Sequence, residues 1–216
     1  MSQLIFNEQS VSPSTPSAGK VSQFYYNSNP PLLAQTEDTG LVYLPSGLTS
    51  SSIANATGFA ADTYLAGSGI VLPVANLFKA QTQYQCTFDM TKTAAGTAAF
   101  TINVRLGTLG TTGDTSRLSL AFAVGTAVAD TGTFTLLVNF RSVGSGTAAV
   151  ISGMVTCNHL LAATGLITTG ASGTGIILGT GAGFDSTTPT RIGISVNGGA
   201  AFAGTNTIVQ SRLINL

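Results

Sequence analysis

Few residues of this chain have side chains that commonly perform catalysis, and the first to consider is its single histidine, His159. A Ser-His-Asp triad needs a nucleophile and an acid around an imidazole, and histidine-based zinc sites need several ligands together. His159 lies in VTCNHLL, at the end of a strand-like run, with no such motif around it. We therefore expect a structural role for it rather than that of a catalytic base.

Carboxylates are also scarce, with eight aspartates and glutamates in 216 residues. Glycosidases need a matched pair of carboxyl groups, and no acid here lies in a recognisable motif of that kind. Asp89, Asp114, Asp130 and Asp185 each lie beside a Gly- or Thr-rich turn, where aspartate commonly accepts hydrogen bonds from the backbone. We predict that all four cap turns, and that the chain has no catalytic residue and is not an enzyme.

The remaining candidates are two cysteines and a glycine-rich segment. Cys86 and Cys157 lie in strand-like runs with no histidine or acid at metal-ligand spacing, so we expect no metal and no cofactor. Buried free thiols are the first expectation, and a disulfide stays open if their strands are adjacent. The segment GTGIILGTGAGFD lacks the signature of a phosphate-binding loop, and we expect a flexible connection between strands there.

The composition is unusual in its lack of charge. Only 7% of the residues are Asp, Glu, Lys or Arg, against about a quarter in ordinary soluble domains. The net charge is zero and the mean hydropathy is +0.38. Because charged surfaces keep soluble proteins apart, this composition predicts a subunit that packs against other subunits.

Composition also argues against several partners. The eight lysines and arginines are scattered from Lys20 to Arg212, whereas nucleic-acid binding needs a basic stripe. No run reaches the roughly 18 apolar residues of a membrane helix, so no membrane partner is expected. The N-terminal residues lack the basic and apolar regions of a secretory signal, so we expect synthesis in a cytoplasm.

The chain divides by composition into three parts: an anchoring arm at 1–45, a Ser-, Gly- and Ala-rich linker at 46–62, and a large domain at 63–216. In the arm, two short strand-like runs flank the turn sequences NSNPP and TEDTG, because Pro30 and Pro31 cannot lie in a central strand. The arm also contains the densest aromatic cluster of the chain. These residues form either an anchor to a partner or a local hairpin core: Phe24, Tyr25, Tyr26 and Tyr43.

The large domain shows period-two alternation of apolar and polar residues in segment after segment. Such alternation is typical of half-buried strands. The inward-facing positions are predicted to be Tyr84, Cys86, Phe88, Met90, Phe100, Ile102, Val104, Leu106, Leu118, Leu120, Phe122, Val124, Phe134, Leu136, Val138, Phe140, Ile151, Val155, Cys157, Ile192, Ile194 and Val196. With no helical window, the pattern predicts an all-β antiparallel β-sandwich of the jelly-roll type, joined to a small N-terminal hairpin arm.

The opposite faces of these strands have Ala, Ser, Thr and Asn rather than Lys and Glu. They therefore lack the charges that discourage association between sheets. Contact with other chains would explain this, and Thr-rich strands exposed to water are the alternative. A tight turn is predicted at Asn197-Gly198-Gly199, between the last two strands.

Two parts of the chain resemble proteins of tailed-bacteriophage virions. TPSAGKVSQFYYNSN followed by TEDTGLVYLP resembles a short strand-turn-strand element of many such proteins, although this chain has Pro30 and Pro31 in the turn. Residues 63–73, 78–120 and 128–144 resemble a β-rich module of tail-fibre, head-fibre and other virion proteins, in which FDMTKTAAGTAA joins two core strands. The resemblance covers about 15–165 and implies a virion component that forms a homotrimer, with no catalytic residue to carry over.

We therefore expect a non-enzymatic structural protein located in the virion, with the arm docked on other proteins of the capsid or tail. A head decoration or fibre is the favoured position. The alternative is a receptor-binding tail-fibre module that recognises a host-surface glycan or protein through loops around Gly170 to Asp185. Aromatic platforms for a sugar are limited to the five tyrosines, because the chain has no tryptophan: Tyr25, Tyr26, Tyr43, Tyr64 and Tyr84.

Overall fold

The computed structural model describes residues 8–9, 17, 21–26, 32–37, 42–43, 47–73, 75–93, 96–168 and 174–216. Side chains are described for residue 17 and, within these ranges, from residue 47 onward. All regular secondary structure in the described residues is β-strand. No helix in this part of the chain has the length and hydropathy needed to cross a bilayer.

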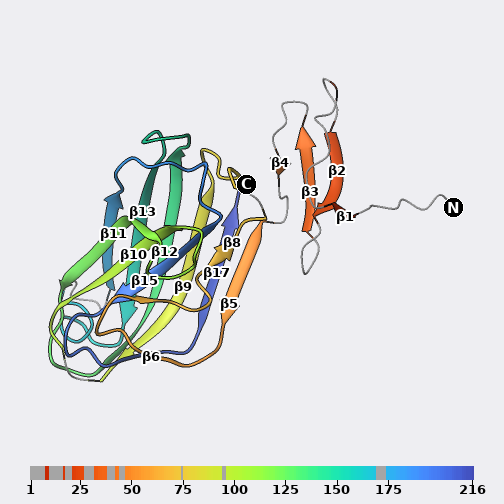
Figure 1. The fold of residues 1–216 in the computed structure, drawn as a ribbon. Coiled ribbons are helices and arrows are strands. Elements are labelled where there is room, and N and C mark those ends of the chain that lie inside the picture. Colours follow the sequence, from red (N-terminus) through yellow and green to blue (C-terminus); the bar gives the residue numbers. More distant parts are fainter. Residues whose placement is uncertain are drawn as a thin grey trace.

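The N-terminal strands form a small sheet of their own, in the order β1-β2-β3-β4 (Figure 1). β2 and β3 are antiparallel, as are β3 and β4, while β1 runs parallel to β2. Tyr26 pairs with Leu32, so residues 27–31 connect β2 and β3, and the turn predicted at NSNPP lies outside the described residues. The strand β3 was not predicted from the sequence. The strands are β1 (Glu8–Gln9), β2 (Val21–Tyr26), β3 (Leu32–Glu37) and β4 (Val42–Tyr43).

The large domain consists of two antiparallel sheets packed as a sandwich (Figure 1). The larger sheet begins with the order β14-β13-β12-β9. On the other side of β9, β17 pairs with one part of this strand, and β5 pairs with β17. β16 pairs with another part of β9, and β6 pairs with β16. Its strands are β5 (Leu48–Ser52), β6 (Ala56–Gly58), β9 (Gln83–Lys92), β12 (Asp130–Ser142), β13 (Val150–His159), β14 (Thr174–Thr180), β16 (Gly204–Asn206) and β17 (Val209–Ile214).

The smaller sheet has the order β11-β10-β15, with β7 and β8 both paired to β15. The chain crosses between the sheets several times, for example from β9 to β10 through the FDMTKTAAGTAA segment. The strands of this sheet are β7 (Thr63–Tyr64), β8 (Ile70–Val71), β10 (Ala99–Gly107), β11 (Thr115–Val124) and β15 (Arg191–Asn197).

Alternating burial and the strand pairing confirm the predicted fold class, an all-β antiparallel sandwich. β9 and β10 alternate between buried and partly buried residues along their whole length. Phe134 of β12 is fully buried and stacks on Phe88 of its own sheet and on Phe100 of the opposite sheet, with ring centroids 5.0 and 4.8 Å apart. Apolar side chains from both sheets thus fill one shared core.

One predicted inward position is wrong. Val124, the last residue of β11, is 58% exposed, although Leu118, Leu120 and Phe122 of the same strand are buried. The β10–β11 pairing shifts register between Ala99 and Thr101, opposite the end of β11. Such an irregularity interrupts the alternation that the sequence pattern assumes.

The structure also differs from the predicted linker at 46–62, because this segment supplies two strands of the sandwich. β5 pairs with β17, and β6 pairs with β16, near the C-terminus. Leu48 and Phe59 are 7% and 1% exposed and belong to the main core. Ser- and Thr-rich runs are typical of edge strands as well as of linkers, and the pairing partners lie some 150 residues further along the chain.

The register excludes a disulfide between the two cysteines. Cys86 of β9 lies opposite Leu136 of β12, and Cys157 of β13 lies opposite Phe134 on the other side of the same strand. A whole strand separates them, and their partners on that strand are two residues apart. Their Cα atoms are therefore about 12 Å apart, beyond disulfide reach. Both are buried free thiols, and burial raises the pKa of each to about 12.

Candidate functional site

All four aspartates accept hydrogen bonds from backbone N–H groups. Asp114 and Asp185 cap their own turns, as predicted, whereas Asp89 and Asp130 bind loops that are distant in sequence. Asp89 accepts hydrogen bonds from the backbone N–H groups of Thr207 and Ile208 before β17. Asp114 accepts three from the hairpin loop at residues 108–110. Asp185 accepts one from the Thr187 N–H at 2.8 Å. Asp130 accepts two, from the N–H groups of Thr131 at 2.8 Å and Leu166 at 2.9 Å. Each carboxylate thus stabilises the loop whose N–H groups it binds.

His159 forms a buried pair with Asp130. Its Nδ1 lies 2.6 Å from Asp130 Oδ2, and neither side chain is exposed. Lys92 Nζ donates to the carbonyls of Thr126 and Gly165 beside them. Burial lowers the pKa of Lys92, and Asp130 acts in the opposite direction.

The pair holds the loop that follows β13. Asp130 Oδ2 contacts both the His159 ring and the Leu166 N–H, and the carbonyl of Gly165 accepts from Lys92. His159 Nε2 is buried without a hydrogen-bond partner among the described residues. The arrangement joins strand ends to a loop, which is the structural role predicted for His159.

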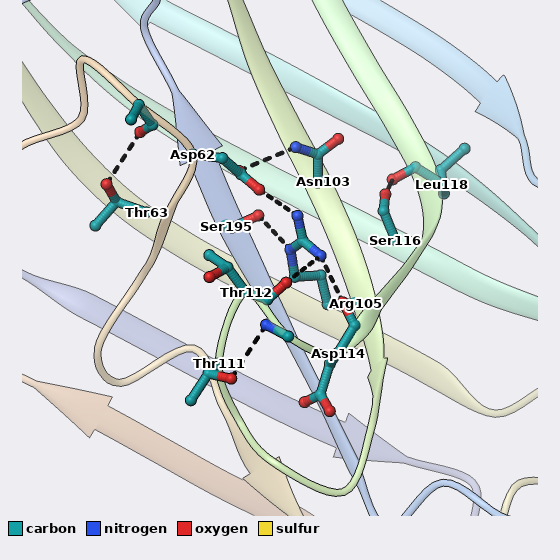
Figure 2. Close-up of polar contacts among 12 residues, drawn as sticks. Asp62, Thr63, Asn103, Arg105, Thr111, Thr112, Asp114, Ser116, Leu118 and Ser195 are labelled. Atoms are coloured by element: carbon teal, nitrogen blue, oxygen red, sulfur yellow. Dashed lines mark hydrogen bonds and ion pairs between the residues drawn. The ribbon is translucent and has the colours of Figure 1, made fainter.

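A second polar cluster joins strands and loops of the smaller sheet through hydrogen bonds (Figure 2). Arg105 of β10 donates to Ser195 Oγ at 2.6 Å, to Asp62, and to the carbonyls of Thr112 and Asp114. It ties the segment before β7 and the β10–β11 loop to neighbouring strands. Because internal partners occupy all three guanidinium nitrogens, we interpret this cluster as structural.

The outer face of the larger sheet is the candidate functional site. The pairing registers align its outward side chains into rows that cross six strands. One row is Ile176, Thr156, Thr135, Thr87, Gln210 and Ser51, and the next is Leu178, Met154, Leu137, Gln85, Arg212 and Thr49. Charged side chains occupy three of the outward positions on these strands: Asp89, Arg141 and Arg212.

One end of this face is apolar. We call Leu137, Met154, Ile176 and Leu178 the apolar half; Met154 pairs with both Leu137 and Leu178 across the strands. Met154, Ile176 and Leu178 are 36%, 55% and 76% exposed. They lie on β13 and on β14, which is the edge strand of the sheet and has no lysine or proline to discourage pairing.

The flexible connection predicted for GTGIILGTGAGFD is wrong, because part of this segment forms the strand β14. Thr174–Thr180 forms a strand antiparallel to β13. A Cβ atom at Gly179 would lie 2.8 Å from Leu120 Cδ2, so its glycine allows β11 of the other sheet to approach closely. The expected recognition loop at Gly170 to Asp185 is therefore largely a strand in the described residues, and 169–173 lie outside them.

The other end of the face is polar and hollowed. An open cavity of about 660 Å³ lies over β5, β17 and β9. Arg212 Nε donates to Gln85 Oε1 at 2.7 Å within it. We call this cavity the polar hollow, and its lining is Thr49, Ser50, Ser51, Gln85, Thr87, Gln210, Ser211 and Arg212.

The aromatic candidates fall into two groups. Phe24, Tyr25 and Tyr26 lie on β2 and Tyr43 lies on β4, but their side chains are outside the described part, so their anchoring role stays a prediction. Tyr84 is fully buried, and its hydroxyl donates to the Ser68 carbonyl at 2.8 Å. The Tyr64 hydroxyl is also buried, close against Gly193. Tyr84 therefore offers no sugar platform, whereas Tyr64 is partly exposed.

Sequence reasoning did not find the residues of the polar hollow as a group. The alternation places Gln85 and Thr87 on the outer side of their strand. Their neighbours Gln210 and Arg212 come from β17, more than 100 residues later, and Thr49 and Ser51 come from β5. No local signal in the sequence indicates that these three strands are adjacent.

The chain matches no protein-family model, and no curated protein matches it. Among solved structures, it is similar to the metal-free form of lectin I-B4 from Griffonia simplicifolia. The similarity covers 91% of this chain and 93% of the lectin chain, at 10% sequence identity and a TM-score of 0.36. At these values it carries no argument about function. Among the described residues, no group of three or more His, Cys, Asp or Glu is placed to hold a metal ion.

Proposed function

We propose that this chain is a non-enzymatic structural protein of a tailed-bacteriophage virion, a head decoration or fibre, that assembles as a homotrimer. The apolar half of the larger sheet carries the proposal. Three large apolar side chains lie exposed on β13 and on β14, the edge strand of this sheet in the described part of the chain, with no charged side chain among them. Soluble proteins protect such edges, and an obligate interface commonly buries more than about 2,000 Å² of similar surface.

The arm at residues 1–45 is proposed to attach the subunit to other proteins of the capsid or tail. Its strands form a sheet separate from the two sheets of the sandwich. A sheet of this size contributes little core of its own, so contact with a partner would stabilise it. The resemblance of 15–29 and 36–45 to a virion element supports a role in attachment for the arm, separate from the role of the sandwich.

Addition of purified protein to particles that lack it tests the proposal. The full chain should attach, and a variant lacking residues 1–45 should not. The truncated variant should unfold at nearly the temperature of the full chain, because the sandwich core starts at Leu48. Attachment of the truncated variant would contradict the role of the arm, and failure of the full chain to attach would contradict the virion assignment.

The polar hollow supports a second candidate function, recognition of a host-surface glycan or protein. It is large enough for a small ligand and is lined by neutral hydroxyl and amide groups around one arginine. Adsorption of the purified chain to host cells would favour this function. Absence of adsorption would leave the assembly function as the better proposal.

A further inference from the structure

The polar hollow has a regular chemical layout, set by the register of three strands. Thr49, Arg212 and Gln85 form one row across β5, β17 and β9, and Ser51, Gln210 and Thr87 form the next. Neighbouring strands are about 4.8 Å apart, and successive outward residues of one strand are about 7 Å apart. Six polar side chains are therefore spread over a small concave area.

Of the described residues that line the hollow, Arg212 is the only charged one. Its Nε donates to Gln85 Oε1, and this is the only hydrogen bond that its guanidinium makes among the described residues. The bond orients the guanidinium and leaves both Nη groups available. A planar guanidinium held in this way matches the two oxygens of a carboxylate.

Among the described residues, no acidic side chain lines the hollow beside Arg212. The nearest acid along β9 is Asp89, whose carboxylate already accepts hydrogen bonds from Thr207 and Ile208. The charge of the hollow is thus positive and uncompensated by its lining. A ligand with one negative group is the complement of this arrangement.

The rest of the lining indicates what else the ligand presents. Thr49, Ser51, Thr87 and Gln210 offer neutral donors and acceptors, and no large apolar or aromatic side chain lines the hollow. Many peptide-binding sites rely on apolar pockets for side chains, whereas the hydroxyl groups of a sugar pair with neutral donors and acceptors like these.

We propose that the polar hollow binds a carboxylate-bearing saccharide, with its carboxylate on Arg212 and its hydroxyl groups on the Thr, Ser and Gln side chains of the two rows. This inference rests on the second candidate function and names its ligand class. It is independent of assembly through the apolar half, which lies at the other end of the sheet.

Titration of the full chain by saturation-transfer NMR tests the inference with matched probes. The probes are methyl glucuronide, methyl galacturonide and the methyl glycoside of N-acetylneuraminic acid, each beside its neutral carboxamide. At least one acid should bind about 10- to 100-fold more tightly than its carboxamide, because the amide loses the charge-assisted pair. Arg212→Gln should remove this preference.

Arg141→Gln is the matched control, since Arg141 is exposed on the same face but does not line the hollow. It removes the same charge and should leave binding unchanged. Equal effects of the two variants would overturn the inference, as would equal binding of acids and carboxamides. Binding of neutral sugars alone would overturn the carboxylate assignment and keep glycan recognition, and binding of no sugar would remove both. Preference for acidic peptides over all sugars would overturn the ligand class.

Discussion

Replacing Ile176 and Leu178 with lysine should break the proposed assembly while leaving the folded protomer intact. The two side chains are 55% and 76% exposed in the single chain. Fully burying a leucine or isoleucine stabilises by about 1.5–3 kcal/mol, so burial of the remaining exposed fractions contributes about 2–4 kcal/mol per protomer. Loss of that contribution weakens association about 30- to 700-fold, and desolvation of the new ammonium groups weakens it further.

The assay is the mass of the double variant by light scattering over a range of concentrations, beside its unfolding temperature. Ile53→Lys with Ile208→Lys is the matched control, because these isoleucines are 87% and 53% exposed and lie outside the apolar half. The control should assemble like the unmodified chain. If the Ile176/Leu178 variant keeps the same mass as the control, or if both lose it, the assignment of the interface to the apolar half is refuted.

Three further predictions concern the interior. Asp130→Asn should lower the free energy of unfolding by about 3 kcal/mol, because it breaks a fully buried pair with His159. The control Asp185→Asn lies on a surface turn and should lower it less. Denaturant titration measures both losses. Gly165→Ala should destabilise more than Gly58→Ala. Both glycines have positive φ, but only the Cβ at 165 would lie 2.3 Å from Asp130 Oδ2; equal losses in thermal unfolding would contradict this packing. Cys86 and Cys157 should resist thiol reagents at pH 8 until the chain unfolds. Because burial raises the pKa of each to about 12 from an ordinary value of 9.0, the unfolded chain releases these protons first, and stability should fall as pH rises from about 9 through about 12. Replacing both cysteines with alanine should flatten this dependence.

The sandwich could be predicted from the sequence because its central strands are half-buried and alternate cleanly. Tyr84, Phe88, Phe134 and Phe140 all occupy the inward positions that the period-two pattern assigns to them. Turn capping by aspartate was also predictable, because the partner backbone groups of Asp114 and Asp185 lie within a few residues.

Edge strands were not predictable by the same means. Residues 48–52 have few apolar side chains. Residues 174–180 have four glycine and threonine positions around Ile176 and Leu178, a composition that resembles a loop. Their strand conformation comes from long-range pairing with β17 and β13. The polar hollow depends on the same long-range pairing, which is why its residues could not be grouped from the sequence.

The mass of the unmodified full chain in solution, measured by light scattering, tests the central claim most directly. We expect a mass of three chains that persists on dilution through the micromolar range, because the proposed assembly buries the charge-poor apolar half between identical subunits. A chain that stays monomeric at these concentrations would contradict assembly as the function of this surface.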